Sequence, residues 1–343
     1  MTVVASETPD AAATRLALDP PTETPAPTPS PTPIPPIRQL TGGGCCVQPS
    51  WSPNSRQVWF IDKPSPDTPA GVYGVSIDAP LSAPARVFDV VGLYAGDLSL
   101  VAYPDGRDTI VARTDNSEYW VIPNGGQSIV FSPDARRIAW ETEDIEGPFD
   151  QRRSDVFVAR FDGQDAVRVA TVFGGGFQGW LDGQRVLFSG RPSLDTRDRT
   201  LTALSLTTNV AVDLVTAERI GGVTASPAGA WIAYFISFNE DDSRNGVWVQ
   251  RADGSGARRL DVWGAYQWRD DARLLYIPLR ESPDEPFVIW EYDTASAQSR
   301  PVTDPAVAPI QIANGDWDVS PDGRYVVYVN SEDRNLWLVE LLP

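Results

Sequence analysis

One short turn motif recurs along this chain, and each copy stands between two runs of β-forming residues. The last copy, Ser320–Arg324, reads Ser-Pro-Asp-Gly-Arg and precedes the Val- and Tyr-rich run Tyr325–Val329. Pro321 presets φ for a turn, Asp322 can bond to the backbone two residues on, and Gly323 tolerates positive φ. The other copies are Ser52–Arg56, Tyr103–Arg107, Ser132–Arg136, Leu181–Arg185, Ser226–Ala230 and Arg269–Arg273. The chain is therefore predicted to consist of short strands joined by equivalent turns.

The pattern repeats at intervals of about 40–50 residues, with three or four short strands in each unit, which is typical of a propeller. A stacked β-sandwich is the structural alternative, but it would not need the same turn chemistry in every unit. We predict an all-β fold, a single seven-bladed β-propeller. The predicted blades are 47–91, 95–126, 127–174, 177–220, 222–263, 265–313, and 316–343 completed by 37–41.

Two blades are expected to depart from the common pattern. The second and third units lie close together in the sequence, so the second blade is predicted to lack a normal outer strand. The last unit ends after its third strand, whereas Ile37–Thr41 resembles Ala257–Asp261, the fourth strand of the fifth unit. We therefore expect the N-terminal strand to supply the missing outer strand and close the ring, which leaves no unpaired junction between the first and last blades.

Residues 1–36 form a Pro/Thr-rich tail in which proline removes the backbone donors that a strand or helix needs. We expect a disordered, extended spacer: a stalk from a membrane anchor, a domain linker, or a tail with no role. The chain has no apolar run near 18 residues and no signal-peptide pattern, so neither a signal nor an anchor is visible in it.

The Ser-Pro-Asp-Gly-Arg turns before aromatic strands, with Arg-Gln-Leu-Thr and Arg-Arg-Leu outer strands, resemble the WD-type repeats of TolB-like propellers. They are also similar to the N-terminal propellers of prolyl-oligopeptidase-type peptidases. The resemblance covers about 37–343. It implies a periplasmic or cell-surface propeller that binds protein or small ligands. The chain departs from those peptidases because it has no Gly-x-Ser-x-Gly nucleophile elbow.

Composition limits the chemistry. The chain has no histidine, which excludes Ser-His and Cys-His nucleophile activation and histidine-based metal sites. Its net charge of −18 opposes binding to nucleic acid or anionic membranes. We predict a non-catalytic, monomeric envelope protein with no cofactor, no metal ion, no nucleic-acid partner and no direct membrane insertion. The alternative is a hydrolase or lyase that uses paired carboxylates, with Asp97, Asp316 and Asp318 as the first suspects.

The ligand or protein partner is expected on the top face of the ring, where Gly-rich junctions between units converge on the channel mouth. Two interpretations of the glycines stay open: a cup floored by backbone amides, or crossings too sharp for a Cβ. The charged loops between second and third strands share this face and show no spaced calcium-loop pattern. The candidate ligand-binding residues are Cys45, Cys46, Asp97, Gln127, Gln178, Tyr266, Asp316 and Asp318.

Cys45 and Cys46 are the only cysteines and are adjacent. Neighbouring Cα atoms are about 3.8 Å apart, closer than a relaxed disulfide prefers. The pair is expected at the rim of the channel. Three interpretations stay open: the two cysteines are bonded and form a rigid turn or a redox switch, they bind a soft metal ion, or they are two free thiols that pack as small apolar residues.

Overall fold

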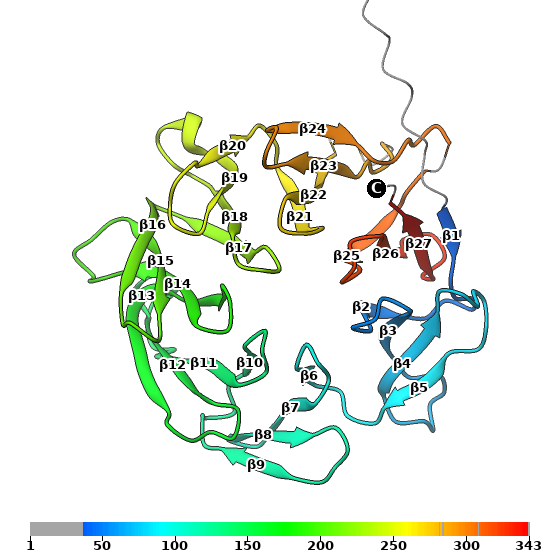
Figure 1. The fold of residues 1–343 in the computed structure, drawn as a ribbon, viewed down its shortest axis with the longest axis horizontal. Coiled ribbons are helices and arrows are strands. Elements are labelled where there is room, and N and C mark those ends of the chain that lie inside the picture. The colour runs from blue at the N-terminus through cyan, green and yellow to red at the C-terminus, as the bar shows by residue number, and fades with distance from the viewer. Residues whose placement is uncertain (1–36, 281, 283–284, 308, 342–343) are drawn as a thin grey trace, which may run out of the picture. The chain divides into compact units, whose positions relative to one another are not determined.

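A computed structural model describes residues 37–280, 282, 285–307 and 309–341; the predicted tail at 1–36 lies outside them. This part of the chain is all-β, and its only helices are two 3-10 turns, η1 Phe149–Gln151 and η2 Asp242–Arg244. In this described part of the chain, no helix is long and apolar enough to cross a membrane. The strands form six sheets arranged around a ring, the arrangement of a propeller (Figure 1).

Five of the sheets have four antiparallel strands. They are β2 Val47–Trp51, β3 Gln57–Asp62, β4 Gly71–Ser76 and β5 Ala85–Phe88; β6 Leu93–Tyr94, β7 Leu100–Asp105, β8 Asp108–Arg113 and β9 Tyr119–Ile122; β17 Ile220–Ala225, β18 Trp231–Ile236, β19 Gly246–Arg251 and β20 Arg258–Leu260; β21 Gly264–Trp268, β22 Arg273–Pro278, β23 Trp290–Asp293 and β24 Gln298–Pro301; and β25 Ile312–Val319, β26 Tyr325–Asn330, β27 Leu336–Glu340 and β1 Ile37–Gln39.

The sixth sheet has seven strands. They are β10 Val130–Phe131, β11 Arg137–Glu143, β12 Arg153–Arg160, β13 Val167–Trp180, β14 Arg185–Arg191, β15 Arg199–Ser205 and β16 Ala211–Ala217. The predicted boundary between the third and fourth blades falls inside β13, so the described residues form six sheets where seven separate blades were expected. The first half of β13 pairs with β12 and the second half with β14, and the register shifts between Phe173 and Gly176.

A close approach explains the glycines at this bend. The Glu141 carboxylate accepts a hydrogen bond from the Phe177 amide at 2.7 Å, and a Cβ on Gly176 would lie 1.8 Å from the same carboxylate oxygen. A Cβ on the neighbouring Gly175 would lie 2.1 Å from the Ser189 carbonyl oxygen, a backbone contact too short for any side chain. Gly175 therefore serves the backbone path, as the second interpretation of the junction glycines expected.

The closure prediction is confirmed. β1 pairs antiparallel with β27, with Ile37 opposite Val339 and Gln39 opposite Trp337. The next two residues also contribute, because the Leu40 amide donates to the Leu336 carbonyl at 2.8 Å and the Thr41 hydroxyl accepts from the Leu336 amide at 2.9 Å. Both chain ends of the ring therefore belong to one sheet.

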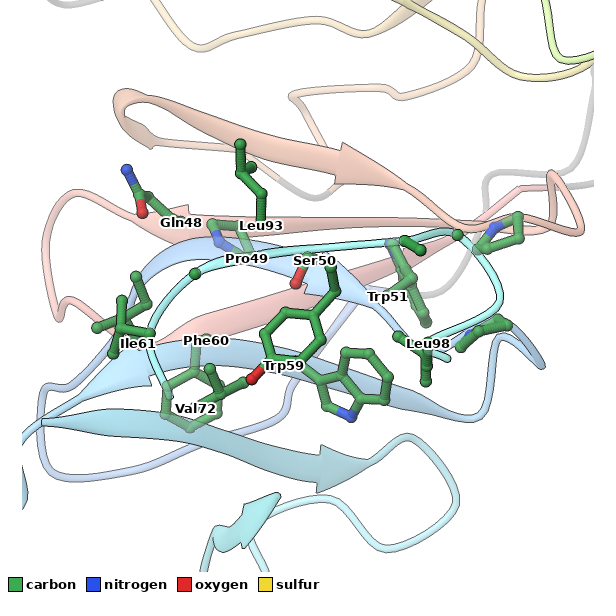
Figure 2. A pocket seen from close by; sticks show the side chains of 17 residues that line it. Gln48, Pro49, Ser50, Trp51, Trp59, Phe60, Ile61, Val72, Leu93 and Leu98 are labelled. Carbon is green, nitrogen blue, oxygen red and sulfur yellow. The ribbon is translucent and has the colours of Figure 1, made fainter. Parts of the chain in front are cut away.

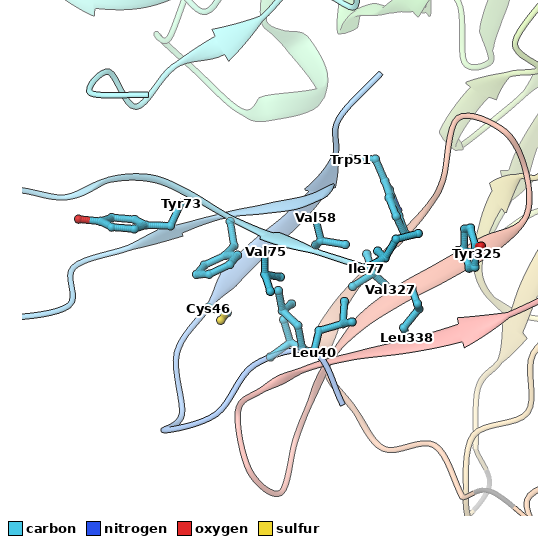
Figure 3. Close-up of a cluster of buried hydrophobic side chains, with 13 residues drawn as sticks. Leu40, Cys46, Trp51, Val58, Tyr73, Val75, Ile77, Tyr325, Val327 and Leu338 are labelled. Atoms are coloured by element: carbon cyan, nitrogen blue, oxygen red, sulfur yellow. The ribbon is translucent and has the colours of Figure 1, made fainter. Parts of the chain in front are cut away.

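Beside this closure lies a core cluster (Figure 3). It is shared by the closing sheet, which contains β25, β26, β27 and β1, and the sheet of β2 to β5. Leu40, Val58, Val75 and Val327 are almost completely buried in it. Alternating residues of neighbouring sheets meet here, as expected where both faces of each sheet pack against a neighbour. Removing Leu40 would leave a cavity in the core, in addition to opening a strand edge.

The prediction for the second unit was wrong. It has an outer strand, β9, and its shortest strand is the inner one, β6. Tyr103–Arg107 is not a copy of the repeated turn but part of the hairpin between β7 and β8, where Asp105 pairs with Asp108. The equivalent turn is Ala95–Leu100, closed by the hydrogen bond from the Ala95 amide to the Leu100 carbonyl. Pro-Asp-Gly suits any tight turn, and Asp-Gly is also a hairpin signal.

Candidate functional site

The repeated turns lie at one edge of the sheets, which we call the turn face. Turn residues of adjacent sheets bond to one another: Arg137 donates to the Gly183 carbonyl, Arg185 to Gly229 and Arg269 to Gly323. The ring of contacts continues from the Ala228 amide to the Asp271 carboxylate and from the Asp322 amide to the Ser55 hydroxyl. The opposite edge, which we call the loop face, carries the connections between second and third strands and the crossings between sheets. It corresponds to the predicted top face.

The structure brings together only two of the predicted site residues, Cys45 and Cys46, which form a disulfide. Cys46 is buried in the cluster of Figure 3, and Cys45 packs against that cluster. Their neighbour is the Thr41 hydroxyl, which lies 3.4 Å from the Cys45 sulfur. This pair therefore packs against the ring closure.

The other predicted residues are dispersed. Asp97 lies on the turn face, in the β6–β7 turn, where its carboxylate accepts from the Ser99 amide at 3.0 Å, so its expected place at the channel mouth is wrong. Gln127 precedes β10 and accepts, through its carbonyl, from Thr109. Gln178 lies in β13, and the Tyr266 hydroxyl in β21 donates to the Gly222 carbonyl at 2.7 Å. Among the described residues, no hydrogen bond or ion pair joins any two of these candidates.

Asp316 and Asp318 lie on β25, the inner strand of the closing sheet. Burial raises the pKa of Asp318 to about 7, and the Val319 amide, which donates to its carboxylate at 3.0 Å, opposes that rise. A carboxyl that titrates near neutrality can transfer protons, but paired-carboxylate chemistry also needs a second acid facing it across the cleft, about 5–9.5 Å away. Among the described residues, no hydrogen bond joins Asp316 and Asp318.

An apolar pocket of about 490 Å³ separates the β2–β5 sheet from the segment 91–98. Figure 2 shows side chains that line it, among them Trp51 and Trp59 from the β2–β5 sheet and Leu93 and Leu98 from the segment 91–98. None of its lining residues is charged. The shortness of β6 accounts for the gap, because a two-residue inner strand fills less of the space between sheets.

The loop face carries a pocket of a different kind, of about 520 Å³, which we call the arginine pocket. Its lining comes from three neighbouring connections: η1, the ends of β14 and β15 with the loop between them, and the crossing from β16 to β17. In a chain with a net charge of −18, four of its seven lining residues are arginines. The lining residues are Phe149, Asp150, Arg191, Arg197, Arg199, Glu218 and Arg219.

Two of these arginines have unsatisfied donors. Arg191 Nη2 and Arg199 Nε are buried and have no hydrogen-bond partner. The pKa of Arg199 is lowered, first by burial and then by repulsion from Arg191 and Arg219. Buried unpaired donors cost about 1–3 kcal/mol each, more when the group is charged. The pocket thus has a local excess of positive charge that an anion would relieve.

The remaining two arginines have partners. Arg197 pairs with Glu218 at 3.0 Å and with Glu240 at 2.8 Å. The Arg219 guanidinium stacks over the Phe238 ring, 4.8 Å from its centroid. Arg191, whose Nη1 also donates to the Thr196 carbonyl at 3.4 Å, and Arg199 are therefore the residues with donors available to a ligand. Guanidinium forks match carboxylate and phosphate oxygens in bidentate geometry, but they do not serve as acid, base or nucleophile.

Sequence reasoning missed this pocket because it considered the charged loops of this face only as a calcium site or as solvated charge, and did not single out the loop 191–199. The available signal was local: three arginines fall within nine residues, at 191, 197 and 199, in a strongly acidic chain. Arg219 could not have been added, since the sequence does not reveal that the β16–β17 crossing meets this loop.

No protein-family model and no curated protein matches the sequence. Solved structures do. An oligogalacturonate lyase from Vibrio parahaemolyticus aligns with a TM-score of 0.61 at 8% identity, over 90% of this chain and 97% of that one. Prolyl oligopeptidase B from Galerina marginata aligns with a TM-score of 0.55 at 11% identity, over 83% of this chain and 46% of that one. TolB from Acinetobacter baumannii aligns with a TM-score of 0.42 at 14% identity, over 82% and 78% of the two chains.

The chain is a β-propeller. The comparisons confirm the predicted resemblance to propeller proteins at the level of the fold, and at these identities they carry no residue roles. At these identities the likeness shows the fold alone, so activity has to be argued from this chain's own residues. Among the described residues, no group of three or more His, Cys, Asp or Glu side chains is placed to hold a metal ion.

Proposed function

We propose that this chain is a non-catalytic, extracytoplasmic binding propeller of the bacterial cell envelope, which captures an anionic protein or small-molecule ligand in the arginine pocket. The observation that carries this proposal is the pair of buried, unpartnered donors on Arg191 and Arg199. Native proteins rarely leave buried donors unpaired. Where such an unpaired donor occurs, it is often at a functional site. Arginine supplies recognition without reactivity, which favours binding over turnover.

The proposal includes a seven-bladed ring in which β13 serves two blades. Its support is the turn face, where seven equivalent turns each close with a hydrogen bond from the amide of the first turn residue to a carbonyl four or five residues on. In each unit a further amide, among them those of Ile77, Thr114 and Leu341, donates back to the turn. The seven-stranded sheet carries two of the seven turns, at Ser132–Arg137 and Leu181–Arg185.

The extracytoplasmic location rests on the Cys45–Cys46 disulfide, because disulfides persist in oxidising compartments. The acidic composition favours a soluble monomer that neither binds nucleic acid nor inserts into membranes.

The test is thermal stabilisation by a small anion. With 10 mM citrate and a dissociation constant of about 1 mM, binding stabilises the fold by about 1.4 kcal/mol. The wild-type protein should show this rise in melting temperature relative to chloride at matched ionic strength, and Arg199→Gln should lose most of it. Arg56→Gln is the matched control, because Arg56 is an exposed turn-face arginine whose ion-pair partner is Asp78. An equal citrate shift in all three proteins rejects the arginine pocket.

Carboxylate-dependent hydrolysis or elimination is the second candidate, and the raised pKa of Asp318 is the observation in its favour. The structural similarity to an oligogalacturonate lyase makes oligogalacturonate the first substrate to try. We expect no unsaturated product, measured by ultraviolet absorbance. Turnover that persists through purification and disappears in Asp318→Asn would establish this candidate instead.

A further inference from the structure

A second depression adjoins the arginine pocket on the loop face. This cleft of about 790 Å³ lies between the β18–β19 loop and the segment after β20. Its lining residues are Ser237, Phe238, Asn239, Asp242, Asn245, Arg259, Asp261 and Trp263. The two depressions meet at Phe238, since the ring that borders the cleft lies under the Arg219 guanidinium of the arginine pocket. One extended ligand can therefore occupy both.

The cleft exposes two aromatic side chains. Phe238 is 73% exposed and Trp263 is 42% exposed. Phe238 also has a left-handed backbone, with φ of +57°, which is uncommon for a bulky residue and is concentrated at ligand clamps and switches. Neither ring contributes to the buried core to the extent that its size allows. Together they offer flat apolar surface to a ligand.

The polar groups of the cleft are held in place by one another. Arg259 donates to the carbonyls of Asp242 and Asn245 and to the Asp261 carboxylate, the last at 2.7 Å. The side-chain amide of Asn245 donates through Nδ2 to Asp242 Oδ1. Asp242 and Asp261 each keep a second carboxylate oxygen with no hydrogen bond among the described residues. The cleft thus presents fixed acceptors beside aromatic rings.

We infer that the ligand of this face is an acidic oligosaccharide of uronic-acid type. Its carboxylates bind Arg191 and Arg199, and a pyranose ring further along the chain stacks on Trp263 or Phe238. The C–H faces of a pyranose fit aromatic rings, and its hydroxyls donate to Asp242 and Asp261. An acidic peptide fits less well, because it offers neither a pyranose face for Trp263 and Phe238 nor a row of hydroxyl donors for Asp242 and Asp261. The inference rests on the proposed anion-binding function and adds the ligand class.

The experiment is isothermal titration with hexagalacturonate, galacturonate, cellohexaose and poly-glutamate as probes. We expect hexagalacturonate to bind the wild type at least about tenfold more tightly than galacturonate, since it reaches both depressions. Cellohexaose, which lacks carboxylates, should bind weakly, and poly-glutamate should bind more weakly than hexagalacturonate.

Variants separate the two depressions. Trp263→Leu should weaken hexagalacturonate by about tenfold and leave galacturonate unchanged, as expected for an aromatic anchor. Arg199→Gln should weaken both. Tyr119→Ala is the control at another exposed aromatic, since Tyr119 on β9 is 70% exposed against 42% for Trp263; it should change neither.

The outcomes distinguish this inference from the function on which it rests. If Arg199→Gln weakens galacturonate but Trp263→Leu leaves hexagalacturonate unchanged, the oligosaccharide inference is wrong and anion binding stands. Poly-glutamate binding as tight as hexagalacturonate likewise rejects it in favour of an acidic protein segment. If no probe binds, or Arg199→Gln has no effect on any probe, both fail.

Discussion

The turn face and the loop face of this propeller are built from the same kinds of residue, yet their polar groups are used differently. On the turn face each serine or aspartate is satisfied locally, as where Ser320 accepts from the Tyr325 amide at 2.9 Å and donates to Asp322 at 2.7 Å. Arg137, Arg185 and Arg269 there bond to the next turn. On the loop face Arg191 and Arg199 retain unpaired buried donors. Repeated residues thus build the scaffold, and residues that break the repeat provide the binding surface.

Inner strands strengthen this scaffold through tryptophans. Trp51, Trp180 and Trp268 each end an inner strand and donate the indole N–H to the inner strand of the preceding unit, to the carbonyls of Asp318, Val130 and Thr224. Changes to the scaffold should therefore lower stability without changing binding, and changes to the loop face should do the reverse.

Ring closure should give the largest effect. Removing residues 1–36 takes away none of the described contacts, so stability should hardly change. Removing residues 1–41 also deletes β1 and the buried residues Leu40 and Thr41, and should lower the free energy of unfolding by several kcal/mol, on the order of 3–6, through lost burial and ladder bonds. Thermal denaturation of the two truncated proteins measures this difference. Equal melting temperatures would mean that β1 does not close the ring.

A single repeated-turn residue should give the next largest effect. Ser320→Ala leaves the Tyr325 amide without its side-chain acceptor and removes one of the two donors to the Asp322 carboxylate, the other being the Arg324 amide. We expect a loss of about 1–3 kcal/mol in urea denaturation, with citrate binding unchanged. Ser331→Ala, at an exposed loop-face serine, is the control and should lie within about 0.5 kcal/mol of wild type. Comparable losses in both variants would remove the distinction between the faces.

Asp318 should make stability depend on pH. Its pKa is raised from 3.8 to about 7 in the folded protein, so folding favours the protonated form. The contribution is fully present below about pH 4 and is lost as the pH rises through 7. Asp318→Asn should flatten this dependence and be more stable than wild type at pH 8 by on the order of 1–2 kcal/mol, a value reduced for partial exposure. Parallel stability curves for the two proteins between pH 4 and 8 would contradict the shift.

The smallest stability change is expected in the arginine pocket. Arg199→Gln removes a charge that Arg191 and Arg219 repel, so the variant should be more stable than wild type by about 0.5 kcal/mol while losing citrate binding. Chemical denaturation at low salt gives the most sensitive comparison, since salt screens the repulsion. A marked loss of stability would make Arg199 part of the scaffold.

The sequence predicted those features that repeat. The turn chemistry, the propeller arrangement and the pairing of 37–41 with the last unit followed from local patterns. Asp97 was misplaced because Tyr103–Arg107 carries the right residues in a hairpin, whereas Ala95–Leu100 forms the true turn without a Ser-Pro pair. The arginine pocket escaped prediction because its members come from three separate connections that only the folded ring brings together.

The most direct test of the central claim observes the arginine side chains themselves. In ¹⁵N NMR spectra of the Nε–Hε groups, added citrate should shift the signal of Arg199, assigned with Arg199→Gln, because its unpaired Nε–H gains an acceptor. The signals of Arg185 and Arg273, whose Nε–H groups already bond to Asp182 and Asp270 at 2.7 Å on the turn face, should stay in place. Citrate shifts at Arg185 and Arg273 with none at Arg199 would contradict the assignment of the two faces.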